Sequence, residues 1–239
     1  MGDSTGIAWT SATWNPWQGC HKVSPACKFC YMFRDKVRYG QDPNIVVRSS
    51  PATFNKPLVW AKNREKYGNI KRVFTCSWSD FFIKEADPWR DEAWDIIRRT
   101  PELTYQILTK RPERIEGHLP SDFTEFNNVW LGISAENNEW LKKRMPDFYP
   151  HTYASVAFLS IEPMLDFVNL TPYLHLIDWV IVGCESGPNA RETKIEWVRD
   201  LQDQCFCANI PFFLKQMVVN GKLTETPELD GKRYMEFPR

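Results

Sequence analysis

The chain lacks any long apolar run. No segment reaches the roughly 18 consecutive apolar residues that a membrane-spanning helix needs, although 43% of the 239 residues are hydrophobic. The first ten residues, MGDSTGIAWT, also lack the basic and apolar parts of a secretory signal. These absences predict a protein that contacts no membrane and stays in the cytoplasm.

A surplus of charge of either sign is also absent. Thirty Lys and Arg residues balance thirty Asp and Glu residues, so the formal net charge is zero. Only a local basic groove could then attract nucleic acid. The candidates for such a groove are Lys71, Arg72, Lys110, Arg111 and Arg114, and the plainer alternative is that they belong to a solvated face.

Internal repeats, low-complexity tracts and proline-rich linkers are missing too. The 17 prolines are spread along the chain rather than gathered at one boundary. This predicts a single domain over residues 1–239, in which about 217–239 form a weakly structured polar C-terminal extension.

What the chain does contain is a set of short apolar runs that alternate with amphipathic segments. The runs are 72–77, 104–109, 128–134, 156–161, 178–183 and 210–215, with a shorter one near 7–10. The amphipathic segments are 28–39, 88–99, 139–145 and 193–208. Continuous apolar runs are typical of strands buried on both faces, and this alternation predicts an α/β fold with parallel strands. We favour a compact, partial (β/α)6 TIM-like barrel, with a doubly wound flat sheet as the alternative.

Chemically capable side chains follow every predicted strand. In a parallel α/β fold these strand ends share one face, which is where active sites form. The candidates are Ser77, Ser79, Asp80, Lys110, Ser134, Glu136, Glu162, Glu185 and Lys215. Ser79 and Asp80 could equally be N-caps of the next helices, whereas lysine and glutamate are poor N-caps.

Seven cysteines, an odd number, are present in a chain predicted to be cytoplasmic. Disulfides are rare there, so a cluster of cysteines indicates metal binding or catalysis. Cys20, Cys27 and Cys30 form a C-x6-C-x2-C motif in a segment interrupted by proline and glycine. The motif predicts a three-thiolate metal site at the mouth of the barrel.

Two kinds of metal centre compete for these thiolates. Structural zinc needs four ligands and would have to recruit His21, Cys76 or Cys184. A [4Fe–4S] cluster held by three cysteines keeps one iron open for an external ligand. We favour the cluster over zinc, and both over unliganded core cysteines.

These motifs together resemble a known family. The segments that carry the resemblance are 9–31, 77–82, 108–113, 131–137, 159–165, 180–187 and 211–216. They are similar to a phage-associated family of largely unassigned function, regarded as a compact, divergent branch of the radical S-adenosylmethionine (SAM) superfamily and related in fold to the spore photoproduct lyases. The resemblance extends from about residue 6 to about residue 220.

The resemblance implies roles for particular residues. Cys20, Cys27 and Cys30 match the cluster ligands, although the superfamily's usual spacing is C-x3-C-x2-C. The usual Gly-Gly-Glu motif that takes the SAM amino group is absent, so Ser77, Ser79 or Asp80 would supply those contacts. The segment from Ser134 to Glu136 would bind the ribose or carboxylate, and Gly183 would let the backbone approach the adenine.

The resemblance also implies an activity. A reduced cluster would pass one electron to SAM, and the resulting 5′-deoxyadenosyl radical would abstract a hydrogen atom from a nucleobase or modified nucleotide, as in phage DNA hypermodification. Such a reaction needs an electron donor such as flavodoxin or ferredoxin, and would occur in the host cytoplasm if the protein is phage-encoded. Phosphate or carboxylate could bind to Lys110, Arg111, Arg191 and Lys215, and an amine or the ribose could bind to Glu162 and Glu185. The alternative is that these residues form salt bridges with one another across the mouth.

Two other functions stay open on the sequence. One is a zinc-stabilised nucleic-acid-binding phage protein without catalysis, which would need a fourth ligand. The other is a metal-dependent nuclease or hydrolase that uses Asp80, Glu136, Glu162 and Glu185, but it leaves the three cysteines unexplained.

Overall fold

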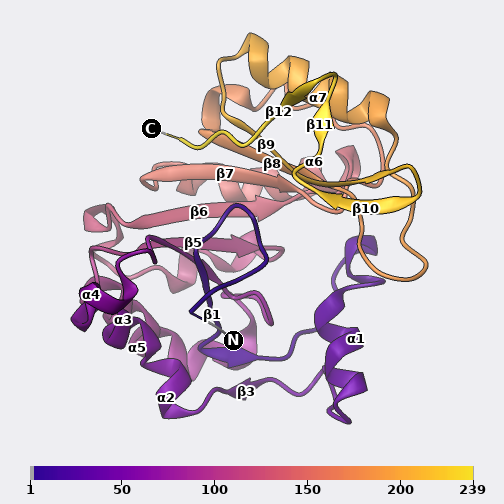
Figure 1. Ribbon diagram of the computed structural model, residues 1–239. Helices are drawn as coiled ribbons and strands as arrows, with labels where there is room; N and C mark the ends of the chain where they lie inside the picture. Colours follow the sequence, from indigo (N-terminus) through magenta and orange to yellow (C-terminus); the bar gives the residue numbers. More distant parts are fainter. Residues whose placement is uncertain (1–2, 239) are drawn as a thin grey trace.

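The computed structural model describes residues 3–238 as a curled sheet with helices on its outer side (Figure 1). The sheet strands are β1 (Ala12–Trp14), β4 (Arg72–Thr75), β5 (Thr104–Thr109), β6 (Val129–Ser134), β7 (Val156–Ile161), β8 (Trp179–Gly183), β9 (Phe212–Val219) and β10 (Lys222–Glu225). They are hydrogen-bonded in this order, and every neighbouring pair is parallel except β9 and β10. Because β1 and β10 are both edges, the sheet forms a half-barrel.

The predicted α/β class with parallel strands is confirmed, and all six main strands lie where the apolar runs predicted them. The strand predicted near 7–10 is wrong. A turn in which the Thr10 amide donates to the Ile7 carbonyl occupies this segment, and the strand begins two residues later. Trp9 instead packs inside the curl against Phe74, with ring centroids 4.6 Å apart.

Four longer helices confirm the predicted amphipathic segments: α1 (Tyr31–Arg38), α5 (Asp87–Arg98), α6 (Asn138–Phe148) and α7 (Ile195–Cys207). The remaining elements are β2 (Trp17–Gln18), β3 (Val47–Arg48), α2 (Pro51–Phe54), α3 (Lys56–Lys62), α4 (Arg64–Tyr67) and the 3-10 turns η1 (Pro25–Cys27), η2 (Lys84–Ala86), η3 (Pro112–Arg114), η4 (Glu116–His118), η5 (Phe123–Glu125), η6 (Tyr149–His151) and η7 (Leu174–Leu176). Helix α1 begins later than the predicted residue 28, because Cys30 occupies its N-cap position.

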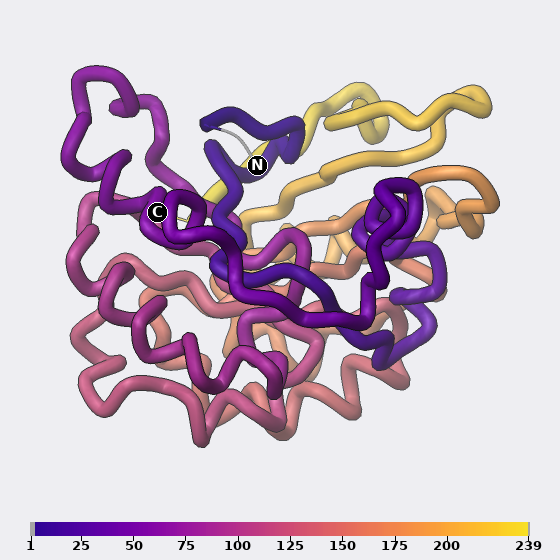
Figure 2. The backbone as a smooth tube through the Cα atoms, turned by 90° about the horizontal axis from the view of Figure 1, so that it is seen from below, coloured from indigo at the N-terminus to yellow at the C-terminus, as the bar shows by residue number. Residues whose placement is uncertain are grey.

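The two faces of the curled sheet have separate cores. The outer core joins alternate strand residues, such as Leu131 and Leu159, to Trp94 and Leu201 of the helices. The inner core contains Trp9, Phe74, Phe158, Trp179 and Phe213, which we call the inner floor. Figure 2 shows the magenta and salmon helical segments along one side of the molecule, with the indigo N-terminal segment and the yellow C-terminal segment along the other.

A glycine makes room for the inner floor. Gly132 on β6 faces the Phe158 ring of β7, and a Cβ atom built there would lie 2.6 Å from the ring. Any larger residue would push the ring away, since real Cβ contacts are never this short. The large rings can therefore fill the base of the half-barrel completely.

The C-terminal extension predicted at about 217–239 is described to residue 238, and Arg239 lies outside the described residues. It forms the end of β9, then β10, and then a hairpin of β11 (Glu228–Leu229) and β12 (Lys232–Arg233). Phe237 stacks near Trp179 and Phe213 of the inner floor, with centroids 5.3 and 5.4 Å apart. These residues form strands instead of the predicted weakly structured tail, because an apolar anchor near the end packs into the core.

Among residues 3–238 no helix has the length and apolar character that crossing a membrane requires.

Candidate functional site

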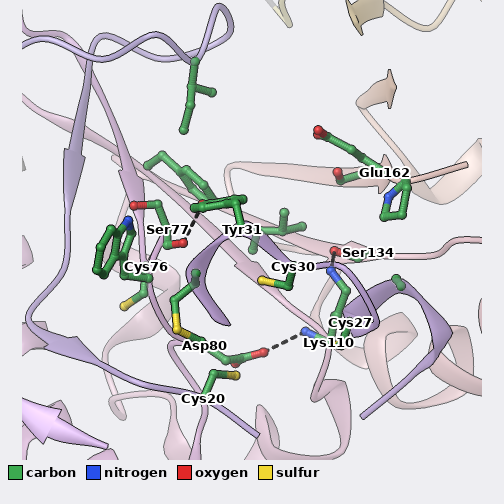
Figure 3. Close-up of a pocket in the computed structure, with 18 of the residues that line it drawn as sticks. Cys20, Cys27, Cys30, Tyr31, Cys76, Ser77, Asp80, Lys110, Ser134 and Glu162 are labelled. Carbon is green, nitrogen blue, oxygen red and sulfur yellow. Dashed lines mark hydrogen bonds between the residues drawn. The ribbon is translucent and has the colours of Figure 1, made fainter. Parts of the chain in front are cut away.

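A cavity of about 530 Å³ lies at the carboxyl ends of the parallel strands, which we call the mouth. Eleven of the predicted site residues line it: Cys20, Cys27, Cys30, Ser77, Ser79, Asp80, Lys110, Ser134, Glu162, Glu185 and Lys215. The inner floor contributes Trp9 and Phe74 to its base. Figure 3 shows Cys20 and Cys30 on the same side of this hollow as Asp80 and Lys110.

The three predicted ligands belong to one loop, residues 19–30, which we call the cysteine loop. It starts at Gly19, whose φ of 98° is left-handed and whose Cβ position would lie 2.3 Å from the Ile45 carbonyl oxygen, so only glycine fits there. Cys27 ends the η1 turn, and Cys30 caps α1. These local features bring all three thiols to the cavity wall.

The first anchor of the cysteine loop is the Asp80–Arg111 pair. Arg111 Nη1 lies 3.0 Å from Asp80 Oδ2 and donates to Cys20 Sγ at 3.6 Å, while Nη2 donates to the His21 carbonyl at 2.8 Å. Asp80 also accepts from the Thr109 hydroxyl and the Lys110 amide at 2.7 and 2.9 Å. Both carboxylate oxygens of Asp80 are therefore occupied by the protein.

Glu136 provides the second anchor and corrects one prediction. It is fully buried, pairs with Arg144 at 2.8 Å and accepts from the Ala26 amide at 3.4 Å. Burial by itself would raise the pKa of Glu136, but Arg144 and a hydrogen bond from Ser24 hold that pKa below its ordinary value. Glu136 lies behind the loop rather than on the cavity wall, so it does not face a ligand as predicted.

The third anchor is the Glu185–Arg191 pair. Arg191 contacts Glu185 at 2.5 Å and donates to the Pro25 carbonyl at 3.0 Å. Burial opposes ionisation of Glu185, yet the hydrogen bonds from Arg191 keep its pKa below the ordinary value. Ser79 adds a neutral contact, because its hydroxyl donates to the Gly19 carbonyl at 2.6 Å. Four predicted ligand-binding groups, Asp80, Glu136, Glu185 and Ser79, thus position the cysteine loop.

The two lysines of the prediction face the cavity. Lys110 Nζ donates to the Ser134 hydroxyl at 2.9 Å, and Lys215 Nζ forms an ion pair with Glu162. Lys110 and Arg111 directly follow the end of β5 at Thr109. The Lys110 ammonium reaches Ser134, whereas the Arg111 guanidinium reaches Asp80 and the cysteine loop. Among residues 3–238 the Lys110 ammonium has only the Ser134 hydroxyl as a partner, so it can bind an anionic group of a ligand.

Gly183 does not take the predicted place. It is not on the cavity wall, and its carbonyl accepts from the Met164 amide at 2.9 Å. A Cβ atom there would meet Gln216 and Glu162 at ordinary distances of 3.4 and 3.5 Å. The Gly183 carbonyl is therefore bonded to the segment that follows β7, and it is not presented to an adenine in the cavity.

Tyr31, which directly follows Cys30 and begins α1, was not among the predicted site residues. Its hydroxyl donates to the Ser77 carbonyl at 2.5 Å, and burial raises the pKa of the phenol. Asn15 was also missed: its side-chain oxygen accepts from the Trp78 amide at 2.7 Å, and its Nδ2 donates to the Ser77 hydroxyl at 2.9 Å. The only signal was position, since both residues flank or belong to the cysteine motif.

The electrostatics of the thiols bear on the predicted metal. Burial raises the pKa of Cys20 to about 12, although Arg111 opposes the shift, and burial also raises the pKa of Cys30. Buried thiols of this kind stay neutral unless a cation replaces the proton, as a metal does. Cys20 beside Arg111 and Cys30 beside Lys110 therefore suit a soft metal centre as donors.

The present side-chain orientations are not those of a ligated site. Within residues 3–238 no three His, Cys, Asp or Glu side chains gather closely enough to hold a metal ion. His21 points to Glu85, with Nε2 2.7 Å from the carboxylate oxygen. All three cysteines nevertheless line one cavity.

Residues 4–238 match the family model described as "Protein of unknown function (DUF5131)". The chain belongs to this family. No curated protein and no solved structure matches the chain. The DUF5131 match covers the half-barrel, the cysteine loop and the C-terminal hairpins alike, so the site described above lies entirely within the family's domain.

Proposed function

We propose that this protein is a radical SAM enzyme with a partial TIM-like barrel, in which Cys20, Cys27 and Cys30 hold a [4Fe–4S] cluster. The observation that carries the proposal is that three thiols from one short loop line a single cavity at the carboxyl ends of parallel strands. Barrels of parallel strands use this face for catalysis. The substrate class we propose is a nucleobase or modified nucleotide.

Three ligands rather than four support a catalytic centre. The nearest histidine in sequence, His21, is committed to Glu85. When bound, a cluster with one open iron would supply SAM with an electron and so provide radical chemistry. The resemblance to the phage-associated branch related to spore photoproduct lyases points the same way, and a flavodoxin or ferredoxin would be the electron donor.

The protein's own residues would bind and shield the reactants. Lys110, held by Ser134, presents a cation to a carboxylate or phosphate. Lys215 and Glu162 present a paired cation and anion that can separate to receive a zwitterionic or polar group. Trp9 and Phe74 close the base of the cavity with apolar surface and exclude water from it.

A zinc-stabilised nucleic-acid-binding protein is the second candidate, and one observation favours it. Cys76 is buried on the same cavity wall, and both burial and Asp80 raise its thiol pKa. A fourth thiol there would complete a tetrahedral site. A metal-dependent hydrolase has less support, because arginines already occupy Asp80, Glu136 and Glu185.

The test is anaerobic purification and reconstitution, followed by iron, sulfide and zinc analysis and a visible spectrum. We expect about four irons per chain and broad absorbance near 400 nm, lost in Cys27→Ala. Cys205→Ala is the matched control, since Cys205 is also buried but lies on α7 in the outer core. One zinc per chain and no colour would reject the radical mechanism.

Cys76→Ser separates the two candidates further. If the cluster reading is right, this variant keeps its iron and its SAM cleavage to methionine and 5′-deoxyadenosine. If zinc is held by four thiols, Cys76→Ser and Cys27→Ala both lose their zinc.

A further inference from the structure

Positive charge is concentrated next to the cavity in an otherwise balanced chain. Residues 20–40 contain five Lys and Arg residues and one Asp, whereas the whole chain has zero net charge. Four of the five are exposed: Lys22, Lys28, Arg34 and Arg38. We call these four the basic rim. Arg34 and Arg38 are one helical turn apart on α1, about 6 Å along its axis, and so share a face.

The basic rim lacks the carboxylate partners that other cations of the mouth have. Across residues 3–238, Lys22, Lys28 and Arg38 form no ion pair, and Arg34 meets only its neighbour Asp35 at 3.3 Å. In contrast, Arg111, Arg144 and Arg191 each pair with a buried carboxylate. The rim charges are therefore available to an external anion.

Two aromatic rings join the basic rim to the cavity. Lys22 Nζ lies over the Phe33 ring at 4.9 Å, and Lys28 Nζ lies over the Phe29 ring at 5.1 Å. Both rings also line the cavity wall. A ligand whose anionic groups follow the rim would thus bring an attached aromatic group to a pocket lined by aromatic rings.

The groove suggested by the sequence does not provide this surface. Arg111 and Arg114 are paired with Asp80 and Asp87, and the Arg72 guanidinium stacks on the Phe237 ring at 3.9 Å. Three of those five cations are consequently engaged inside the fold, and a fourth, Lys110, faces the cavity itself. The exposed cations of the cysteine loop and α1 are those of the basic rim.

We propose that the basic rim binds the phosphate backbone of a nucleic-acid strand and that the cavity receives one of its bases. The inference rests on the proposed function only for the reaction of that base, because the binding itself needs neither iron nor SAM. Four separated cations exceed what one phosphate needs, which favours a strand over a free nucleotide. The aromatic cavity wall favours a nucleic acid over an anionic membrane surface, which offers no ring to stack.

The test measures fluorescence anisotropy of labelled single-stranded DNA, single-stranded RNA and duplex DNA with metal-free protein at several salt concentrations. The variant is Lys22→Gln/Lys28→Gln/Arg38→Gln. Each lost phosphate contact lowers the slope of log affinity against log salt by about 0.7 for a single strand, so we expect a total decrease of about 2. Comparing the DNA and RNA strands identifies the natural polymer, and the duplex should bind more weakly because its bases are stacked.

The control is Lys62→Gln/Lys66→Gln/Lys142→Gln, which removes the same charge. Lys66 also lies over a tyrosine ring, at 5.2 Å. Lys62 and Lys66 belong to α3 and α4, on the opposite side of the molecule from α1 (Figure 1), and Lys142 is an exposed residue of α6. This control should keep the wild-type slope, and circular dichroism checks that both variants fold. Equal slopes for the two variants would overturn the proposal.

Entry of a base into the cavity can be measured separately by fluorescence. A strand carrying 2-aminopurine should brighten on binding, because its base leaves the stack, and the rim variant should lose this increase. Binding to phosphatidylserine vesicles without binding to any nucleic acid would assign the rim to membranes and overturn the proposal. Salt-dependent strand binding in a protein that fails the iron test would leave this inference standing and reject the radical mechanism alone.

Discussion

The inner floor and the mouth lie on the same strands but serve different purposes. Strand β7 carries Phe158 inward at the floor and Ser160 inward nearer the mouth, and Glu162 follows on the same side. At the floor, rings contact rings; at the mouth, polar groups contact one another and the cysteine loop. A half-barrel can therefore devote one end of each strand to stability and leave the other end to chemistry.

The two regions also differ in how they are held. The inner floor is stabilised by non-directional burial, which tolerates small shifts in position. The cysteine loop is held by three Arg–carboxylate pairs and the Ser79 hydroxyl, whose geometry is directional. Substitutions at the floor should reduce stability most, while substitutions at the mouth should reduce it less and also alter the site.

The largest effect should come from the floor. Trp179→Ala removes a fully buried ring that packs against Trp9, Trp130 and Phe213, and it breaks the 2.8 Å bond to the Glu236 carbonyl. We expect a loss of about 3–5 kcal/mol in the free energy of unfolding, measured by urea denaturation. Phe206→Ala, at a ring that is 76% exposed, should change little. A loss below about 1 kcal/mol for Trp179→Ala would mean that the inner floor contributes little to stability.

The next largest effect should come from the buried anchor at the mouth. Glu136→Gln leaves the Arg144 guanidinium buried without its counter-charge, so stability should fall by about 3 kcal/mol. Replacing both partners with apolar residues, Glu136→Leu and Arg144→Met, should recover part of that loss in the same urea assay. A double variant no better than the single one would show that the Ala26 contact matters more than the charge pair.

Acid should reduce the stability contributed by the mouth but not that contributed by the inner floor. The folded-state pKa values of Glu136 and Glu185 lie below their ordinary value of 4.5, so the unfolded chain binds more protons as pH falls. The stability that they contribute is present above about pH 4.5 and is lost as pH falls through their folded-state values. Unfolding at stepwise lower pH should show a shallower loss for Glu136→Gln than for the wild type, whereas Trp179→Ala should keep the wild-type slope.

The smallest effects should come from a matched pair of serines. Ser79 donates to the Gly19 carbonyl and Ser155 to the Val129 carbonyl, both at 2.6 Å, the first at the mouth and the second before β7 at the floor. Each alanine substitution should cost about 1 kcal/mol. Limited proteolysis should then cut the cysteine loop faster only in Ser79→Ala. Equal cutting in both variants would show that Ser79 does not restrain the loop.

Much of the architecture could be predicted from local patterns. The six main strands and four long helices follow from apolar runs and amphipathic spacing, because burial of these residues is required in any α/β arrangement. The segments 7–10 and 217–239 were predicted wrongly for one reason. Trp9 and Phe237 both pack against the inner floor, and only the shape of that floor shows where they lie.

The sequence by itself determined the parallel α/β class, the face on which the strand ends meet, and the grouping of Cys20, Cys27 and Cys30 at that face. These follow from short-range periodicity and spacing. Only the tertiary structure decided which polar residues face the cavity and which hold the loop. Lys110 and Arg111 are neighbours in the chain and both lie at the cavity wall, yet the first reaches Ser134 and the second binds Asp80 and the loop, because these partners come from segments distant in sequence.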